Sequence, residues 1–201
     1  MPSKTEIANM ALHRVGAQRI MDLNDADSKS ARVVRDFFEP AIREVGRLAE
    51  WQCLKDRATL AQIATPPSFG WDYAYQLPAT FLRLVKLNGV DYRGQPGDDH
   101  EIEGRTLLTD ETEAKIEFIA YKDSTADYDP LFVKAIVAKL AAEIAIPIRQ
   151  DEALAARLMG EFEQLALPKA RTKTAGERRL KRFDPTAESS FTQSRFNSTN
   201  G

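Results

Sequence analysis

Cysteine and histidine are scarce in this sequence. Cys53 is its single cysteine, and His13 and His100 are its two histidines, among 201 residues. One cysteine cannot form an intrachain disulfide or a cysteine-based metal cluster, and two histidines make a mixed zinc site hard to assemble. We therefore expect neither a disulfide framework nor a metal centre.

Long hydrophobic runs and the common enzyme motifs are absent as well. No stretch is apolar for the length that a bilayer requires, and the first residues, MPSKTEIANMAL, lack the apolar core of a signal peptide. The sequence contains no P-loop, no dinucleotide-binding glycine fingerprint, no HExxH and no GxSxG. We expect a soluble protein made in the cytosol, with no catalytic residues, no cofactor and no membrane partner.

Charge is nearly balanced overall but unevenly placed. The formal net charge is -2, with 43% hydrophobic and 29% charged residues, as in ordinary globular proteins. From residue 169 onward the chain carries many more basic than acidic side chains, and its last residues are rich in Ser, Thr and Asn. The overall charge argues against uniform nucleic-acid binding, whereas the basic tail has the sign needed for an acidic partner.

The segment 128–146, YDPLFVKAIVAKLAAEIAI, is predicted to be the core helix. Asp127 or Asp129 can cap its start, and Pro130 suits its first turn, where no amide hydrogen is needed. Its polar residues form one narrow stripe, so the helix is apolar around most of its circumference and must be covered on several sides. We expect Pro147 to end it.

Three further helices are predicted to cover this core. Residues 5–16, 28–51 and 150–165 place apolar side chains at spacings of three and four. Pro40 lies inside the second of these helices, which predicts a kink there or two helices in series. The last helix can pack antiparallel on the core helix across a short connection.

Between the helices the hydrophobic period changes to that of strands. Residues 57–121 contain short alternating runs, separated by turn-rich loops at 65–72 and 91–101, with a hairpin signal at Asn88-Gly89. We interpret the chain as an α+β protein. Residues 1–56 and 122–168 would form a body of about four main helices, 57–121 an inserted antiparallel β-domain, and 169–201 an extended basic C-terminal arm.

Two clusters are compatible with a metal, but simpler interpretations are favoured. The loop 17–27 offers several Asp and Asn side chains yet lacks the Gly and the final Glu of a calcium-binding EF-hand loop, so we favour a solvated turn that supplies the N-cap of the next helix. His100 has acidic neighbours, but contiguous side chains in an extended loop diverge, which favours an acidic solvated loop. Cys53 and His13 lack partners at suitable spacing, which favours structural roles.

The basic tail leaves two interpretations open. It is too polar to fold alone, so it is either disordered or an arm that becomes ordered on a partner, with its phenylalanines as anchors. The same tail is the basis for an alternative function, that of a DNA-binding accessory protein, although no recognition helix accompanies it.

Five segments follow one another in the order found in a known family. They are ALHRVGAQRIMDLND, REVGRLAEWQCLKDRATLA, PPSFGWDYAYQLPATFLRLVKLNG, IEGRTLLTD and IEFIAYKDSTADYDPLFVKAIVAKLAAEIA, and they fall within residues 5–165. In combination they resemble tail tubular protein A, the family of head-to-tail adaptors, or connectors, of short-tailed bacteriophages. The tail after residue 170 is similar only in being basic and low in complexity.

The resemblance implies a non-enzymatic structural protein of the virion, located at the head-to-tail interface and assembled in the host cytoplasm. Its copies would form a dodecameric ring between the portal protein and the tail nozzle protein, with tail fibres as further neighbours. DNA would pass through the lumen without sequence-specific binding, and the ring would help close and conduct this channel during genome ejection.

The resemblance also suggests where partners bind. Portal contacts are expected in the tail, at Arg171, Lys173, Arg178, Arg179, Lys181, Arg182 and Phe183. Trp71 and Tyr73 are expected to contact a neighbouring subunit or the nozzle, although packing inside the β-domain explains these aromatic residues equally well.

Overall fold

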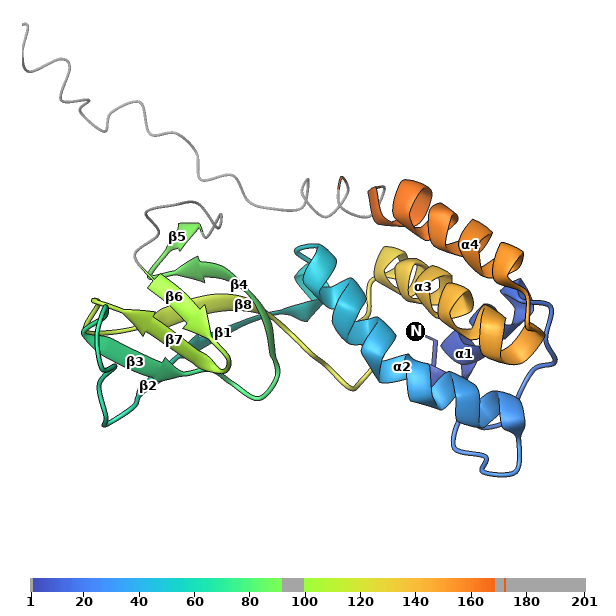
Figure 1. The fold of residues 1–201 in the computed structure, drawn as a ribbon, viewed down its shortest axis with the longest axis horizontal. Coiled ribbons are helices and arrows are strands. Elements are labelled where there is room, and N and C mark those ends of the chain that lie inside the picture. The colour runs from blue at the N-terminus through green and yellow to red at the C-terminus, as the bar shows by residue number, and fades with distance from the viewer. Residues whose placement is uncertain (1, 92–99, 169–171, 173–201) are drawn as a thin grey trace, which may run out of the picture.

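The computed structural model describes residues 2–91, 100–168 and 172. In this part of the chain, four α-helices and two small antiparallel sheets form an α+β fold, which confirms the predicted fold class (Figure 1). The predicted C-terminal arm lies outside the described residues except for Thr172. Within the described ranges, no helix combines the length and apolarity needed to cross a membrane.

Helix α3, Pro130–Arg149, is the core helix, as predicted. Asp129 caps it, accepting a hydrogen bond from the Leu131 amide at 2.7 Å, and Pro130 occupies the first turn. The helix packs against α1, α2 and α4, and Figure 1 shows it lying between α2 and α4. Burial on several sides explains why its sequence is apolar around most of the cylinder.

The prediction that Pro147 ends this helix is wrong. Pro147 lies inside α3, which continues to Arg149 and ends where Gln150 adopts the left-handed conformation with φ 56°. Proline removes one backbone donor, but the surrounding turn is held by burial of Ile144 and Ala145 in the core. Packing of this apolar turn outweighs the one lost hydrogen bond.

Helix α2, Lys29–Leu48, is one continuous helix rather than two in series. The Ser28 hydroxyl caps it by accepting from the Ala31 amide at 3.2 Å. Pro40 is on the exposed side, where water can bind the Asp36 carbonyl that lacks an amide partner. The interruption is therefore tolerated.

Helix α1, Lys4–Arg14, and the loop that follows it in the sequence cover one side of the helical body. Ser3 and Glu6 form a capping box at its start, and Gly16 takes φ 68° just after its end. The buried Asn9 side chain both donates to the Ile20 carbonyl at 2.9 Å and accepts from the Ile20 amide at 2.8 Å. This pair of hydrogen bonds holds the α1–α2 loop on the core.

Helix α4, Glu152–Glu161, continues into a π-helical turn, Phe162–Ala166. Asp151 caps α4, accepting from the Leu154 amide at 2.8 Å, and Leu158 and Phe162 are buried. The helix runs back along α3 in the opposite direction, as predicted (Figure 1).

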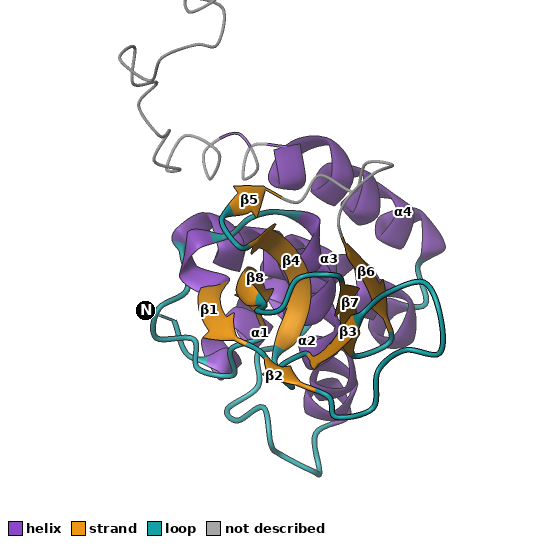
Figure 2. Cartoon of the chain, turned by 90° about the vertical axis from the view of Figure 1, so that its left-hand side faces the viewer, coloured by secondary structure: helices purple, strands orange, loops and turns teal. Residues whose placement is uncertain are grey.

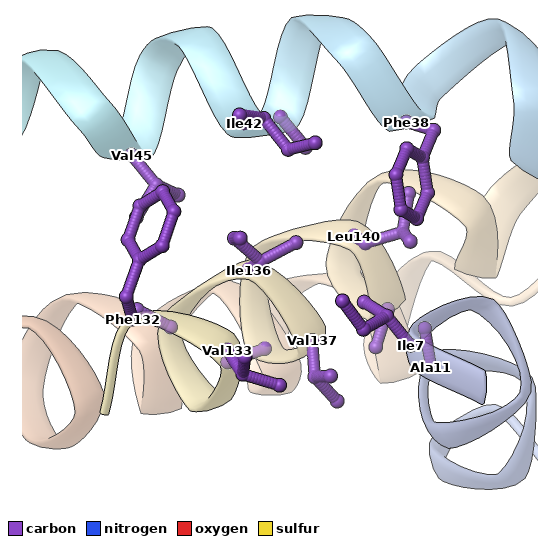
Figure 3. Packing of buried hydrophobic residues seen from close by; sticks show 14 of the residues in the cluster. Ile7, Ala11, Phe38, Ile42, Val45, Phe132, Val133, Ile136, Val137 and Leu140 are labelled. Atoms are coloured by element: carbon purple, nitrogen blue, oxygen red, sulfur yellow. The ribbon is translucent and has the colours of Figure 1, made fainter. Parts of the chain in front are cut away.

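Figure 3 shows how the helices interlock. Ile42 and Val45 of α2 face Ile136 and Phe132 of α3. On the other side of α3, the α1 residues Ile7 and Ala11 lie beside Val137. All of these side chains belong to one buried cluster, which makes the helices a single packing unit.

The segment between α2 and α3 folds into two four-stranded sheets, after a short 3-10 turn at Gln52–Leu54. One sheet has the order β1-β8-β4-β5, formed by Lys55–Thr59, Lys115–Ala120, Phe81–Leu87 and Val90–Asp91. The other has the order β2-β3-β7-β6, formed by Ala61–Gln62, Tyr73–Gln76, Thr106–Thr109 and His100–Glu103. The predicted hairpin at Asn88-Gly89 is confirmed, with φ 48° and 86°.

The first sheet joins the two parts of the molecule. On one of its faces, Ile116 and Phe118 pack with Tyr75 and Leu107 of the second sheet in a separate core. From its other face, Leu82, Val85 and Ile119 enter the helical core. Figure 2, viewed from the β-domain end, shows the strands in front of the helices. Because β4 and β8 contribute to both cores, the β-domain is anchored on the helical body.

Candidate docking site on the β-domain

The loop between β2 and β3 is largely exposed. It is tied down at both ends, where the Ile63 amide donates to the Ala74 carbonyl at 2.7 Å and the Asp72 amide donates to an Asp110 carboxylate oxygen at 3.0 Å. In Figure 1 this loop lies at the end of the β-domain that points away from the helices. A loop anchored in this way presents its side chains in a defined place.

Beside this loop is a cleft of about 440 Å³. The loop forms one wall with Pro66, Pro67 and Phe69, and strands β6 and β7 form the other with Glu101 and Leu108. The cleft thus combines apolar surface with carboxylates. It suits a partner that offers an apolar side chain together with a hydrogen-bond donor or a basic group.

Phe69 is the large hydrophobic side chain that this surface exposes to solvent. It is 88% exposed, and it stands next to Gly70, which takes φ 88°. Covering a phenylalanine ring with a partner is worth about 1.5–3 kcal/mol of apolar burial. Sequence reasoning selected Trp71 and Tyr73 and missed Phe69, although an aromatic residue between Ser68 and Gly70 in a proline-rich turn was a usable signal.

The two predicted aromatic residues have different surroundings. Trp71 is partly buried, lines the cleft, and donates from Nε1 to the Glu101 carboxylate at 3.3 Å. Tyr73 begins β3 and packs against the core between the two sheets. The structure therefore places Trp71 in the lining of the candidate docking site and the partly buried Tyr73 against the core of the β-domain.

The predicted portal contacts, Arg171, Lys173, Arg178, Arg179, Lys181, Arg182 and Phe183, all lie outside the described residues. Thr172 is the described residue in this part of the chain. It is exposed, and its hydroxyl donates to the Pro168 carbonyl at 3.0 Å.

Cys53 and His100 were considered as a possible nucleophile and a possible metal ligand, and their surroundings favour structural roles. Burial raises the pKa of the partly buried Cys53 thiol, which leaves less of the reactive thiolate at neutral pH. His100 begins β6 rather than lying in a loop. Among the described residues, no three His, Cys, Asp or Glu side chains are placed to hold a metal ion together.

The carboxylates of the α1–α2 loop shape its turns. Asp22 accepts from the Asn24 amide at 3.0 Å, and Asp25 accepts from the Asp27 amide at 2.9 Å. Such side-chain turns are a common use of Asp in loops. These contacts agree with the favoured interpretation of the segment as a turn, but the N-cap of α2 is Ser28, which follows the loop rather than belonging to it.

Comparison with known proteins found no match for this chain, either among protein-family models or among curated proteins.

Proposed function

We propose that this chain is a head-to-tail adaptor of a short-tailed bacteriophage, a structural protein whose copies form a dodecameric ring between the portal protein and the tail nozzle protein. The proposal is founded on the five ordered segments that resemble this family. They fall within residues 5–165, which comprise the helical body and the β-domain.

The structural feature that best supports the proposal is the position of the exposed loop at the tip of the β-domain. A connector needs one surface for each of two partners, and these surfaces have to lie apart. Phe69 and Trp71 belong to the β2–β3 loop, and this loop lies at the end of the β-domain that points away from the helices. This arrangement leaves the helical body for contacts between copies and directs an apolar anchor toward the nozzle.

Charge is also compatible with a DNA channel. The whole chain has a net charge of -2 although residues 169–201 are strongly basic, so residues 1–168 are acidic. An acidic wall repels phosphates, so DNA passes along it rather than being retained. The basic tail, in contrast, is suited to an acidic surface of the portal.

A binding experiment with two altered chains tests the proposal. Portal rings and nozzle protein of the same phage are mixed separately with the full chain, with a chain that lacks residues 170–201, and with Phe69→Ser. The shortened chain is expected to keep its thermal melting temperature and lose portal binding, whereas Phe69→Ser keeps portal binding and binds the nozzle protein at least about tenfold more weakly.

Two results would contradict the proposal. One is a full chain that binds neither partner. The other is tight binding of duplex DNA that falls steeply with salt and disappears with residues 170–201, since this is the behaviour of a DNA-binding accessory protein.

A further inference from the structure

A second cleft, of about 410 Å³, lies where the helical body meets the β-domain. It is lined by the last turn of α2, by β4 and by the β6–β7 turn, which points toward the helices in Figure 1. Each of these three elements contributes one arginine: Arg47, Arg83 and Arg105. We call this the arginine cleft.

Backbone carbonyls hold the three guanidinium groups in place. Arg47 donates to the Leu82 carbonyl at 2.5 Å, Arg105 donates to the Pro78 carbonyl at 2.7 Å, and Arg83 donates to the Arg47 carbonyl at 3.4 Å. A carbonyl orients a guanidinium but does not neutralise its charge. Each arginine has five N–H groups, so donors remain available for a further acceptor.

The charges of the cleft are not balanced by the described residues. Arg83 lies 3.6 Å from a Glu50 carboxylate oxygen, while Arg47 and Arg105 form no ion pair within the described ranges. Of the three arginines that line the cleft, one has a carboxylate partner among the described residues. An anion with a planar, two-oxygen geometry fits this arrangement, because arginine binds carboxylates through two parallel hydrogen bonds.

The opposite charge lies at the other end of the same helix. Asp22, Asp25 and Asp27 precede Ser28, the cap of α2, whereas Arg47 lies in its last turn. A helix of 20 residues is about 30 Å long, so the acidic loop and the arginine cleft are well separated in one molecule.

The helix dipole explains only part of this distribution. Acidic residues before a helix and basic residues at its end are favourable in any protein, which accounts for Asp27 and Arg47. It does not account for Arg83 and Arg105, because these residues belong to the β-domain and reach the cleft from β4 and from the β6–β7 turn. A binding role explains all three arginines.

We infer that the acidic loop of one copy, residues 22–27, docks in the arginine cleft of the next copy. This contact joins two different surfaces, so repeating it produces a ring when the rotation closes. The inference rests on the proposed function, and it assigns one of the contacts between subunits. Exposed ion pairs are individually weak, and their main effect is to fix the orientation of one copy against the next.

Charge reversal on both sides of the contact tests the inference. Asp27→Arg and Arg47→Asp are made separately and together, and assembly is followed by mass photometry over a range of protein and salt concentrations. Each single change should raise the protein concentration needed for assembly by about tenfold or more. The double change recreates an ion pair between neighbours and should return this concentration to within about threefold of wild type.

Matched controls lie on the same helix. Arg35→Asp and Asp36→Arg reverse equal charges at exposed positions of α2 away from the cleft and should leave assembly within about threefold of wild type. Asp27 is exposed, so Asp27→Arg should keep the fold. The melting temperature of every variant is measured to separate misfolding from loss of assembly. Arg105→Asp, tested beside Arg47→Asp, removes a second arginine of the cleft.

The outcomes separate this inference from the proposed function. If wild type assembles and the single reversals assemble equally well, or the double change fails to restore assembly, the inference is overturned while the adaptor function stands. If wild type does not assemble, alone or on portal rings, both are overturned. If the arginine variants assemble normally but lose binding to duplex DNA, the cleft binds phosphate instead and the inference is wrong.

Discussion

The ammonium of Lys139 on α3 lies 2.7 Å from a carboxylate oxygen of Glu44 on α2, and it is the one buried lysine of the described residues. A second carboxylate, that of Glu143 on the same helix, lies at 2.8 Å. The ring of Phe162, at the end of α4, lies 5.9 Å from the ammonium. This side chain thus connects three helices through one cation.

Replacing Lys139 separates its packing role from its charge. Lys139→Met keeps most of the volume, and both carboxylates retain access to water, so we expect the free energy of unfolding to change by less than about 1 kcal/mol. Lys139→Ala leaves a void and should cost about 2–4 kcal/mol. Urea unfolding at neutral pH measures both. Equal losses for the two variants would show that the charge, rather than the volume, stabilises the fold.

The comparison of wild type with Lys139→Met also gives a prediction for alkaline pH. Burial lowers the pKa of Lys139, but hydrogen bonds to Glu143 and Glu44 outweigh burial and hold the pKa above its ordinary value of 10.5. A raised pKa contributes stability below the unfolded-state value, and this stability is lost as pH rises through the folded-state value. Wild type should therefore lose stability relative to Lys139→Met above about pH 10.5. A constant difference up to pH 11.5 would contradict the assigned hydrogen bonds.

Gln150 occupies a position that favours glycine. Its φ of 56° is left-handed, and its amide donates to the Ile146 carbonyl at 2.8 Å to close α3. Since left-handed backbone is unfavourable for residues with a Cβ atom, Gln150→Gly should stabilise the protein by about 0.5–1 kcal/mol. Gln150→Val should destabilise it, because β-branched residues tolerate this conformation poorly. Thermal melting checks both signs, and a gain with valine would be incompatible with the left-handed cap.

Asn9 provides a test of how the acidic loop is positioned. Its buried amide makes both hydrogen bonds to the Ile20 backbone, so Asn9→Ala leaves a buried donor and a buried acceptor without partners. We expect a loss of about 2–4 kcal/mol. Backbone hydrogen exchange should accelerate at residues 17–27 more than in α3. Uniform acceleration over the whole chain would show that the loop is not held locally.

Phe69 and Tyr75 contrast an exposed aromatic residue with a buried one. Phe69→Ser should change the free energy of unfolding by less than about 0.5 kcal/mol, because the ring is 88% exposed. Tyr75 is 2% exposed, and its hydroxyl donates to the Glu111 carbonyl at 2.8 Å, so Tyr75→Ala should cost about 3–5 kcal/mol. A strong destabilisation by Phe69→Ser would mean that the loop belongs to the core and is not a docking surface.

Sequence patterns predicted the secondary structure well where a feature depends only on residues close to it in the sequence. The Asp129 cap, the apolar circumference of α3 and the Asn88-Gly89 hairpin are each determined by a few neighbouring residues. Pro147 and Pro40 show the limit. Whether a proline ends a helix depends on what packs around the freed carbonyl, and this information lies in distant segments.

The candidate binding surfaces were only partly predictable for the same reason. Trp71 was expected at a contact because of the family resemblance, whereas the exposure of Phe69 depends on how strands β6 and β7 border the loop. Arg47, Arg83 and Arg105 lie far apart in the sequence and come together only through sheet pairing and the packing of α2 on β4. No short sequence window contains such a cluster.

The native mass of the purified full chain, measured alone and after mixing with portal rings of the same phage, tests the adaptor proposal most directly. The account predicts a closed ring of about a dozen copies, formed at high protein concentration or on the portal, and weakened by salt if the arginine cleft joins the subunits. A chain that remains a monomer or dimer at every concentration and does not bind portal rings would contradict the proposal.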